Sequence, residues 1–197
     1  MEAHIIQRIG AYLIDMIIVS FIVLFLTFWI PQSEKYNNAV KKSEELFNEF
    51  LKEDSKLSYD EYYNESSKLR YTLDKESVII NIIQIVVIVG YFGSFAYYNN
   101  GQTFGKKLLK IKIVPSIDSE LNHINLIGRA VLVEGVFTTL VSIVFVFLVD
   151  YKKYSMISYF FSGIQFLFII SCFVMILSRN DKRGLHDIIF RTKVIKE

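Results

Sequence analysis

The sequence predicts an all-α membrane protein with four transmembrane helices. Of its 197 residues, 52% are hydrophobic, and they are gathered into blocks rather than spread along the chain. A spanning helix needs about 20 consecutive apolar residues to cross the hydrocarbon core. Alternation with period two, the pattern of a transmembrane β-barrel, is not found in the sequence. Four blocks have the required length: residues 11–30, 78–98, 130–149 and 155–177.

The first block contains an acid, Asp15, and follows a base, Arg8. A secretory signal would end in a small-x-small cleavage site, and residues 27–31 offer none, so we expect this block to remain in the protein. A carboxylate at the centre of a spanning helix costs roughly 2.5–3.5 kcal/mol. Asp15 is therefore expected to have a partner or a function.

Two hypotheses for Asp15 stay open. In the structural one, Asp15 pairs with Arg8 or Arg129, or accepts hydrogen bonds from polar groups such as Gln84, Ser94 or Tyr97, because lipid offers no partner. In the functional one, burial and a nearby arginine tune the carboxyl so that it exchanges a proton for a cation.

Residues 32–77, between the first two blocks, contain eleven acids and eight bases. Ser58 and Glu61 fit the capping box that begins a helix, which predicts a helical hairpin in this loop. One interpretation is that the hairpin rests on the membrane surface or on the bundle. The other is that it is a docking surface for a partner.

The distribution of charge predicts the topology. Residues 99–129 hold five bases against two acids, and residues 178–197 hold six bases against three acids. The positive-inside rule places both segments in the cytoplasm. With four spans, both termini are then cytoplasmic, and the loop of residues 32–77 is extracellular. The expected location is the cell membrane.

A second intramembrane acid, Glu134, follows Arg129 by about one and a half helical turns. We expect Asp15 and Glu134 to lie at a similar shallow depth and to form one charged layer with Arg8 and Arg129. This depth favours a structural network or an inner gate over a midplane transport site. Asp187, in the tail, is expected to anchor the tail to an arginine: Arg8, Arg129 or Arg183.

The two cytoplasmic segments are expected to form a small cap. Residues 109–114 and 192–196 both favour short strands, which could pair beneath the bundle. Residues 101–106 do not have the spacing of a phosphate-binding loop, which argues against a nucleotide site. Anionic lipid headgroups are the expected partners of the lysines in this segment. These lysines are Lys106, Lys107 and Lys110.

Scattered polar residues in these segments resemble one known family in their order and spacing. They are Arg8 and Asp15 in the first block; Gly101, Gln102, Thr103, Gly105 and Lys106 after the second; Arg129 before the third; and Arg183, Gly184, Leu185, His186, Asp187 and Thr192 near the end. The pattern is similar to that of the RDD family, small bacterial membrane proteins named for one arginine and two aspartates. Arg8 and Asp15 match the first two of these residues, and Asp187 is the best match for the third.

The resemblance implies a polytopic plasma-membrane protein, and a minority of the family resembles cation/proton antiporters. One hypothesis is a monovalent cation/proton antiporter or other secondary transporter, acting as an oligomer with Asp15 as the exchange residue. The chain shows no obvious broken helix at mid-membrane, which counts against transport by a monomer. The alternative is a non-catalytic accessory or regulatory protein that binds another membrane complex.

Enzymatic chemistry is not expected. The adjacent His186 and Asp187 cannot act as a catalytic dyad, because neighbouring side chains of a helix point about 100° apart. The sequence has no metal-ligand pattern, and we expect no metal, cofactor or nucleic-acid partner. The single cysteine, Cys172, excludes a disulfide framework.

Overall fold

The computed structural model describes residues 2–52, 54–116 and 120–197. Within these described ranges, three helices are long and apolar enough to cross a membrane. They are α1 (Ile5–Thr27), the continuous helix Val78–Tyr98 and α9 (Tyr151–Ser178). Their apolar side chains remain largely exposed in the isolated chain, as lipid-facing surfaces are. The prediction of a helical membrane protein is confirmed.

The helix Val78–Tyr98 changes its winding along its length. It consists of α4 (Val78–Ile88), a π-helical segment η1 (Val89–Phe95) and α5 (Ala96–Tyr98). π-Helical turns inside α-helices are rare and are frequently found at functional sites. Here the wider turns contain Tyr91, whose side chain reaches α1, as described below.

The third apolar block is a broken helix, which corrects the expectation that the chain has no such feature. Helix α7 (His123–Val133) ends at Glu134, and α8 (Val136–Leu148) begins after Gly135 at an angle of 65° to it. Gly135 has φ +70°, a left-handed conformation that commonly ends a helix and that glycine adopts without steric cost. The pair amounts to a fourth span if both helices together cross the membrane.

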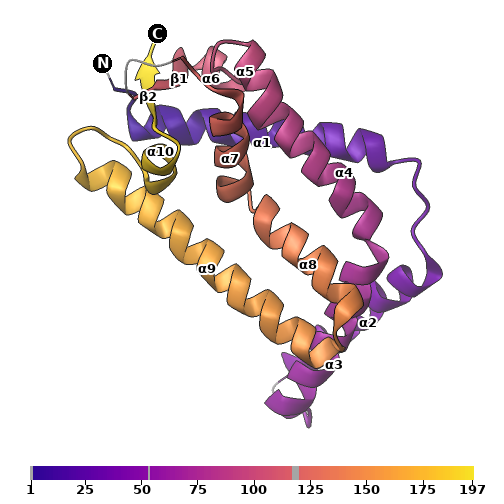
Figure 1. Cartoon of the computed structure of the whole chain (residues 1–197). Coiled ribbons are helices and arrows are strands. Elements are labelled where there is room, and N and C mark those ends of the chain that lie inside the picture. Colours follow the sequence, from indigo (N-terminus) through magenta and orange to yellow (C-terminus); the bar gives the residue numbers. More distant parts are fainter. Residues whose placement is uncertain (1, 53, 117–119) are drawn as a thin grey trace.

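The long loop between the first two spans folds as the predicted helical hairpin, α2 (Glu34–Phe50) and α3 (Tyr59–Glu76). Ser58 and Glu61 form the expected capping box at the start of α3. The rings of Phe50 and Tyr62 stack with centroids 4.2 Å apart and join the two helices. The hairpin packs against α8 and α9, at the end of the molecule opposite the termini (Figure 1).

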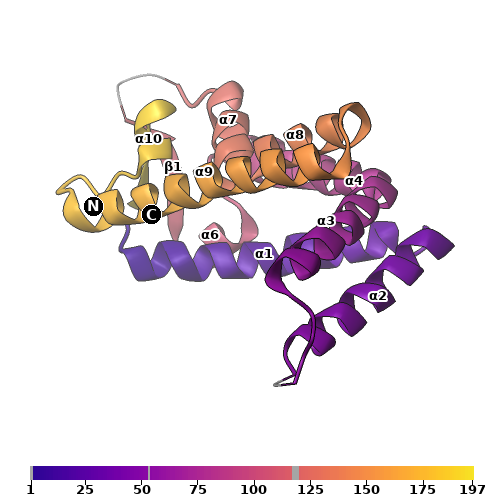
Figure 2. The ribbon, with the colours of Figure 1, turned by 90° about the horizontal axis from the view of Figure 1, so that it is seen from below.

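The two termini meet at the other end in a small cap, which we define as α6 (Phe104–Leu108), β1 (Ile111–Pro115), α10 (Leu185–Ile189) and β2 (Thr192–Lys196). The strands pair antiparallel, with Ile113 opposite Val194, which confirms the predicted pairing. The first strand begins at Ile111 because Lys110 has φ +53° and turns the chain. Figure 2 shows the cap at one end of the bundle, with α1 on the side opposite α7 and α10.

Candidate functional site

Asp15 lies on α1 and is completely buried where α6 crosses that helix. Its carboxylate accepts hydrogen bonds from the Tyr91 hydroxyl at 2.6 Å, the Thr103 hydroxyl at 2.5 Å and the Gly105 amide at 2.7 Å. The Lys106 ammonium lies 3.9 Å away. A single carboxylate thus joins α1 to η1 and to α6.

The close approach of α6 depends on Gly105. A Cβ added there would lie 2.2 Å from the Ala11 carbonyl oxygen and 2.9 Å from the Asp15 carboxylate. Thr103 begins α6 by accepting a hydrogen bond from the Lys106 amide. The segment Thr103-x-Gly105-Lys106 therefore places a hydroxyl, a backbone amide and an ammonium group around the Asp15 carboxylate.

The prediction of which residues bind Asp15 is wrong. Arg8 and Arg129 are not among its partners in the described part of the chain, nor are Gln84, Ser94 and Tyr97. Arg8 lies seven residues before Asp15, so it is about 10 Å away along the helix axis. The cap places its own donors nearer to Asp15.

Both arginines bind Asp187 instead, at the start of α10. The Arg8 guanidinium lies 3.3 Å from the Asp187 carboxylate, and the Arg129 guanidinium donates a short hydrogen bond to it. Thr192 donates at 3.3 Å and the Gly184 amide at 3.1 Å. Of the three arginines expected as anchors of the tail, two are present here; the third, Arg183, pairs with Asp181.

The pKa of Asp187 reflects this environment. Burial alone would raise the pKa, but Arg129, His186 and Arg8 outweigh burial and lower it to about 2. Asp187 is therefore ionised at neutral pH. Burial, helped by Arg129, lowers the pKa of the adjacent His186 to about 4, so that this imidazole is neutral. Its Nδ1 lies 3.2 Å from the Cys172 sulfur.

Glu134, the second intramembrane acid, ends α7 at the helix break. Its carboxylate accepts a hydrogen bond from the Tyr12 hydroxyl at 3.3 Å. The charged residues form three hydrogen-bonded centres, around Asp15, Asp187 and Glu134, and three members of the expected layer, Arg8, Arg129 and Glu134, line one cavity.

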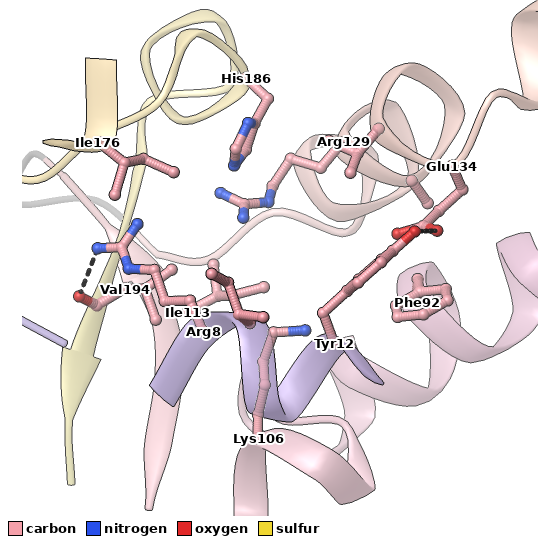
Figure 3. Close-up of a pocket in the computed structure, with 13 residues that line it drawn as sticks. Arg8, Tyr12, Phe92, Lys106, Ile113, Arg129, Glu134, Ile176, His186 and Val194 are labelled. Carbon is pink, nitrogen blue, oxygen red and sulfur yellow. Dashed lines mark hydrogen bonds between the residues drawn. The ribbon is translucent and has the colours of Figure 1, made fainter. Parts of the chain in front are cut away.

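A cavity of about 220 Å³ lies between these centres. Its walls come from α1, η1, α7, the end of α9 and the cap, and Figure 3 shows the side chains that line it. The charged lining residues are Arg8, Lys106, Arg129 and Glu134. Asp15 and Asp187 do not line the cavity; each faces its own hydrogen-bond donors.

The remaining motif residues stabilise the cap. Gly101 has φ +82° and lies so close to β1 that a Cβ would meet the Ile113 carbonyl oxygen at 2.0 Å. The Gln102 amide donates to the Ile111 carbonyl and to the Glu197 carboxylate, each at 3.1 Å. These contacts join α6, β1 and the C-terminus. Lys107 and Lys110, predicted to contact lipid headgroups, do not line the cavity.

The described residues hold no group of three His, Cys, Asp or Glu side chains that could bind a metal ion. The donors around Asp15 and Asp187 instead bind carboxylates of the chain itself. Tyr91 and Tyr12, which bind Asp15 and Glu134, were not predicted from the sequence. A tyrosine in an apolar block is common in membrane helices, so only their positions in the fold show the contact.

The chain has several spanning helices and, at one end of them, a cap that is attached through buried carboxylates. These features define a multi-pass membrane protein. The profile of the RDD family matches residues 2–191, nearly the whole chain. The chain therefore belongs to the RDD family, as the resemblance of its motifs implied. No curated protein and no solved structure matches it.

Proposed function

We propose that this protein is a non-catalytic accessory protein that binds another membrane protein through its α2–α3 hairpin. The observation that supports this proposal is the complete use of Asp15 and Asp187 by donors of the chain itself. A transported cation needs oxygen ligands, whereas these carboxylates are enclosed by hydrogen-bond donors. Their role is to attach the cap to the bundle.

The hairpin has the side chains that a partner surface needs. Phe47 is 49% exposed, Leu51 62% and Tyr59 70%. Tyr59 also lines a cavity of about 630 Å³, together with other tyrosines of α3 and α9 and with Arg70. Tyrosine and arginine are enriched among the residues that dominate the binding energy of protein interfaces.

The same proposal includes an orientation in the cell membrane, with the cap cytoplasmic and the hairpin extracellular, as the distribution of basic residues favours. Single-cysteine variants of a Cys172→Ser parent test it with a membrane-impermeant maleimide. We expect Tyr59→Cys to react in intact cells and Lys193→Cys to react only after lysis. The reverse pattern would contradict the orientation.

Site-specific photo-crosslinking tests the partner. A photoreactive phenylalanine at position 59 is expected to give one adduct larger than the chain, with another membrane protein. An adduct only with a second copy would show self-association and would contradict the proposal. The matched control is Tyr98, a tyrosine with 79% exposure at the opposite end. If positions 47, 51 and 59 give only lipid adducts, the hairpin rests on the membrane and the proposal fails.

A second candidate function, exchange of a monovalent cation for a proton, is favoured by the helix break. Discontinuous helices at ion sites are typical of secondary transporters. The break places Glu134, rather than Asp15, against a cavity and beside a tyrosine hydroxyl. The exchange residue of this candidate is therefore Glu134, with Lys106 able to pair with it when no cation is bound.

Sodium/proton exchange in everted vesicles tests this candidate. Activity in the wild type, abolished by Glu134→Gln and kept by Asp181→Asn, would support it. Asp181 is the matched control because it is an acid of the exposed turn after α9, where it pairs with arginines. A folded wild type without exchange would exclude the candidate.

A further inference from the structure

The lining of the cavity between α1, α7 and α9 contains more cations than acids, although Arg8 and Arg129 also pair with Asp187 and Lys106 lies 3.9 Å from Asp15, both outside the lining. Three cations and one acid line it, and Figure 3 shows Arg8 on one side, Glu134 on the other, and Arg129 and Lys106 between them. The Arg8 side chain is 90% buried, and its Nε has no hydrogen-bond partner among the described residues. A buried donor without an acceptor is costly, so a ligand with acceptor oxygens in this cavity would stabilise the Arg8 side chain.

The cavity opens on the surface of α1 that faces lipid. Two of its lining residues on α1, Ile9 and Tyr12, are 43% and 40% exposed. The next apolar residue along this helix, Leu13, is 57% exposed. Ile176 of α9 lines the cavity from the other side. A ligand can therefore enter sideways from the bilayer.

The volume limits what can be held. At about 220 Å³ the cavity is smaller than the roughly 300–1,000 Å³ of sites that enclose a drug-sized molecule. It holds a phosphate and a short polar group, whereas acyl chains would stay outside against the exposed apolar residues of α1 and α9. The arginine fork matches phosphate oxygens in pairs, and lysine adds a point charge.

We infer that this cavity binds the headgroup of an anionic phospholipid that has hydroxyl groups beyond its phosphate, such as phosphatidylglycerol. The phosphate lies between Arg8, Arg129 and Lys106. Glu134, at the far side, accepts a hydrogen bond from a headgroup hydroxyl. A choline headgroup offers the same phosphate but no such donor. This site is independent of partner binding at the hairpin.

Native mass spectrometry of the delipidated, full-length protein in detergent measures the binding. We expect phosphatidylglycerol to bind about tenfold or more tightly than phosphatidylcholine, since a hydrogen bond to Glu134 is gained. Soluble glycerol phosphate at the same concentration is expected not to be retained. Equal binding of the two lipids would overturn the inference. Retention of glycerol phosphate would show a soluble ligand instead of a lipid and would also overturn it.

Two variants assign the binding to this cavity without changing its charges. Ile9→Trp fills the opening and is expected to weaken phosphatidylglycerol binding about tenfold, with an unchanged melting temperature. Leu13→Trp, an exposed position one turn further along α1 and outside the lining, is the matched control. If both tryptophan variants bind the lipid like the wild type, the lipid lies elsewhere and the inference fails.

Discussion

Thr103 donates a hydrogen bond of 2.5 Å to the carboxylate of Asp15, which lies 88 residues earlier in the chain. The contact joins the cap to the first spanning helix. Both side chains are completely buried, so water cannot replace either partner. The stability of this junction is therefore sensitive to changes in single residues.

Asp15→Asn is expected to destabilise the folded protein by about 2–4 kcal/mol, because the neutral amide accepts fewer hydrogen bonds and brings its own donors against Tyr91, Thr103 and Gly105. Denaturant unfolding in detergent measures the effect. Asp181→Asn, which removes half-exposed ion pairs with Arg179 and Arg183, is the control and should cost about 1 kcal/mol or less. Equal losses of stability in the two variants would contradict the role of Asp15 in attaching the cap to α1.

Arg129 and Asp187 are expected to be energetically coupled, because removing either side chain would leave the other as an uncompensated buried charge. A double-mutant cycle with Arg129→Gln and Asp187→Asn should give a coupling free energy of about 1–3 kcal/mol. The exposed pair Lys153 and Asp150 provides the control cycle, for which we expect less than about 1 kcal/mol. A negligible coupling for the buried pair would show that Arg8 alone compensates Asp187.

Gly105→Ala is expected to prevent α6 from docking on α1, because the added Cβ meets backbone 2.2 Å away that cannot move independently. The variant should accumulate poorly in membranes and unfold at a lower temperature. Gly163→Ala is the control: nothing lies within 4 Å of a Cβ there. Since alanine favours a helix interior by about 1 kcal/mol over glycine, that variant should be as stable as the wild type or more stable.

The attachment of the C-terminal tail is expected to weaken below neutral pH. The folded-state pKa of His186 is lowered to about 4 from 6.5, so the unfolded tail binds more protons between these values. Stability is thus full above about pH 6.5 and falls as the pH drops toward 4, by an amount on the order of 3 kcal/mol. Asp187, with a pKa lowered to about 2, adds a further loss between about pH 4 and 2.

Hydrogen exchange of β2 between pH 7 and pH 2 measures this loss, after correction for intrinsic exchange rates. In His186→Gln, which cannot be protonated, the change between pH 6.5 and 4 should disappear while the loss below pH 4 remains. An unchanged pH profile in this variant would assign the dependence to another group.

Local patterns in the sequence predicted the elements of this fold better than their contacts. The capping box at Ser58 and Glu61 predicted the start of α3, because a helix N-terminus is stabilised by neighbours within one turn. The alternation in residues 109–114 and 192–196 likewise predicted the paired strands. The break at Glu134 and Gly135 was missed, because the apolar run continues through it and a single glycine is compatible with a straight helix.

The sequence predicted the right set of charged residues for the site, but some of the predicted pairs between them were wrong. Arg8, Arg129 and Asp187 lie together, whereas Asp15 is bound by Tyr91 and by the Thr103–Lys106 segment. Charge alone suggested that an acid pairs with an arginine. Three hydrogen-bond donors at close range can stabilise a buried carboxylate as an arginine does. The spacing of residues along the chain does not show which donors lie near the carboxylate.

The sequence by itself determined the class of the protein, its helical membrane spans, its hairpin and its family. These follow from apolar length and from short-range capping and strand patterns, which depend on residues close together in the chain. Only the tertiary structure decided which cation faces which carboxylate, where the third apolar block breaks, and that a cavity lined by Arg8, Lys106 and Arg129 opens beside α1. The reason is physical: a buried charge selects its partners by distance in space, and packing of the cap against α1 sets that distance.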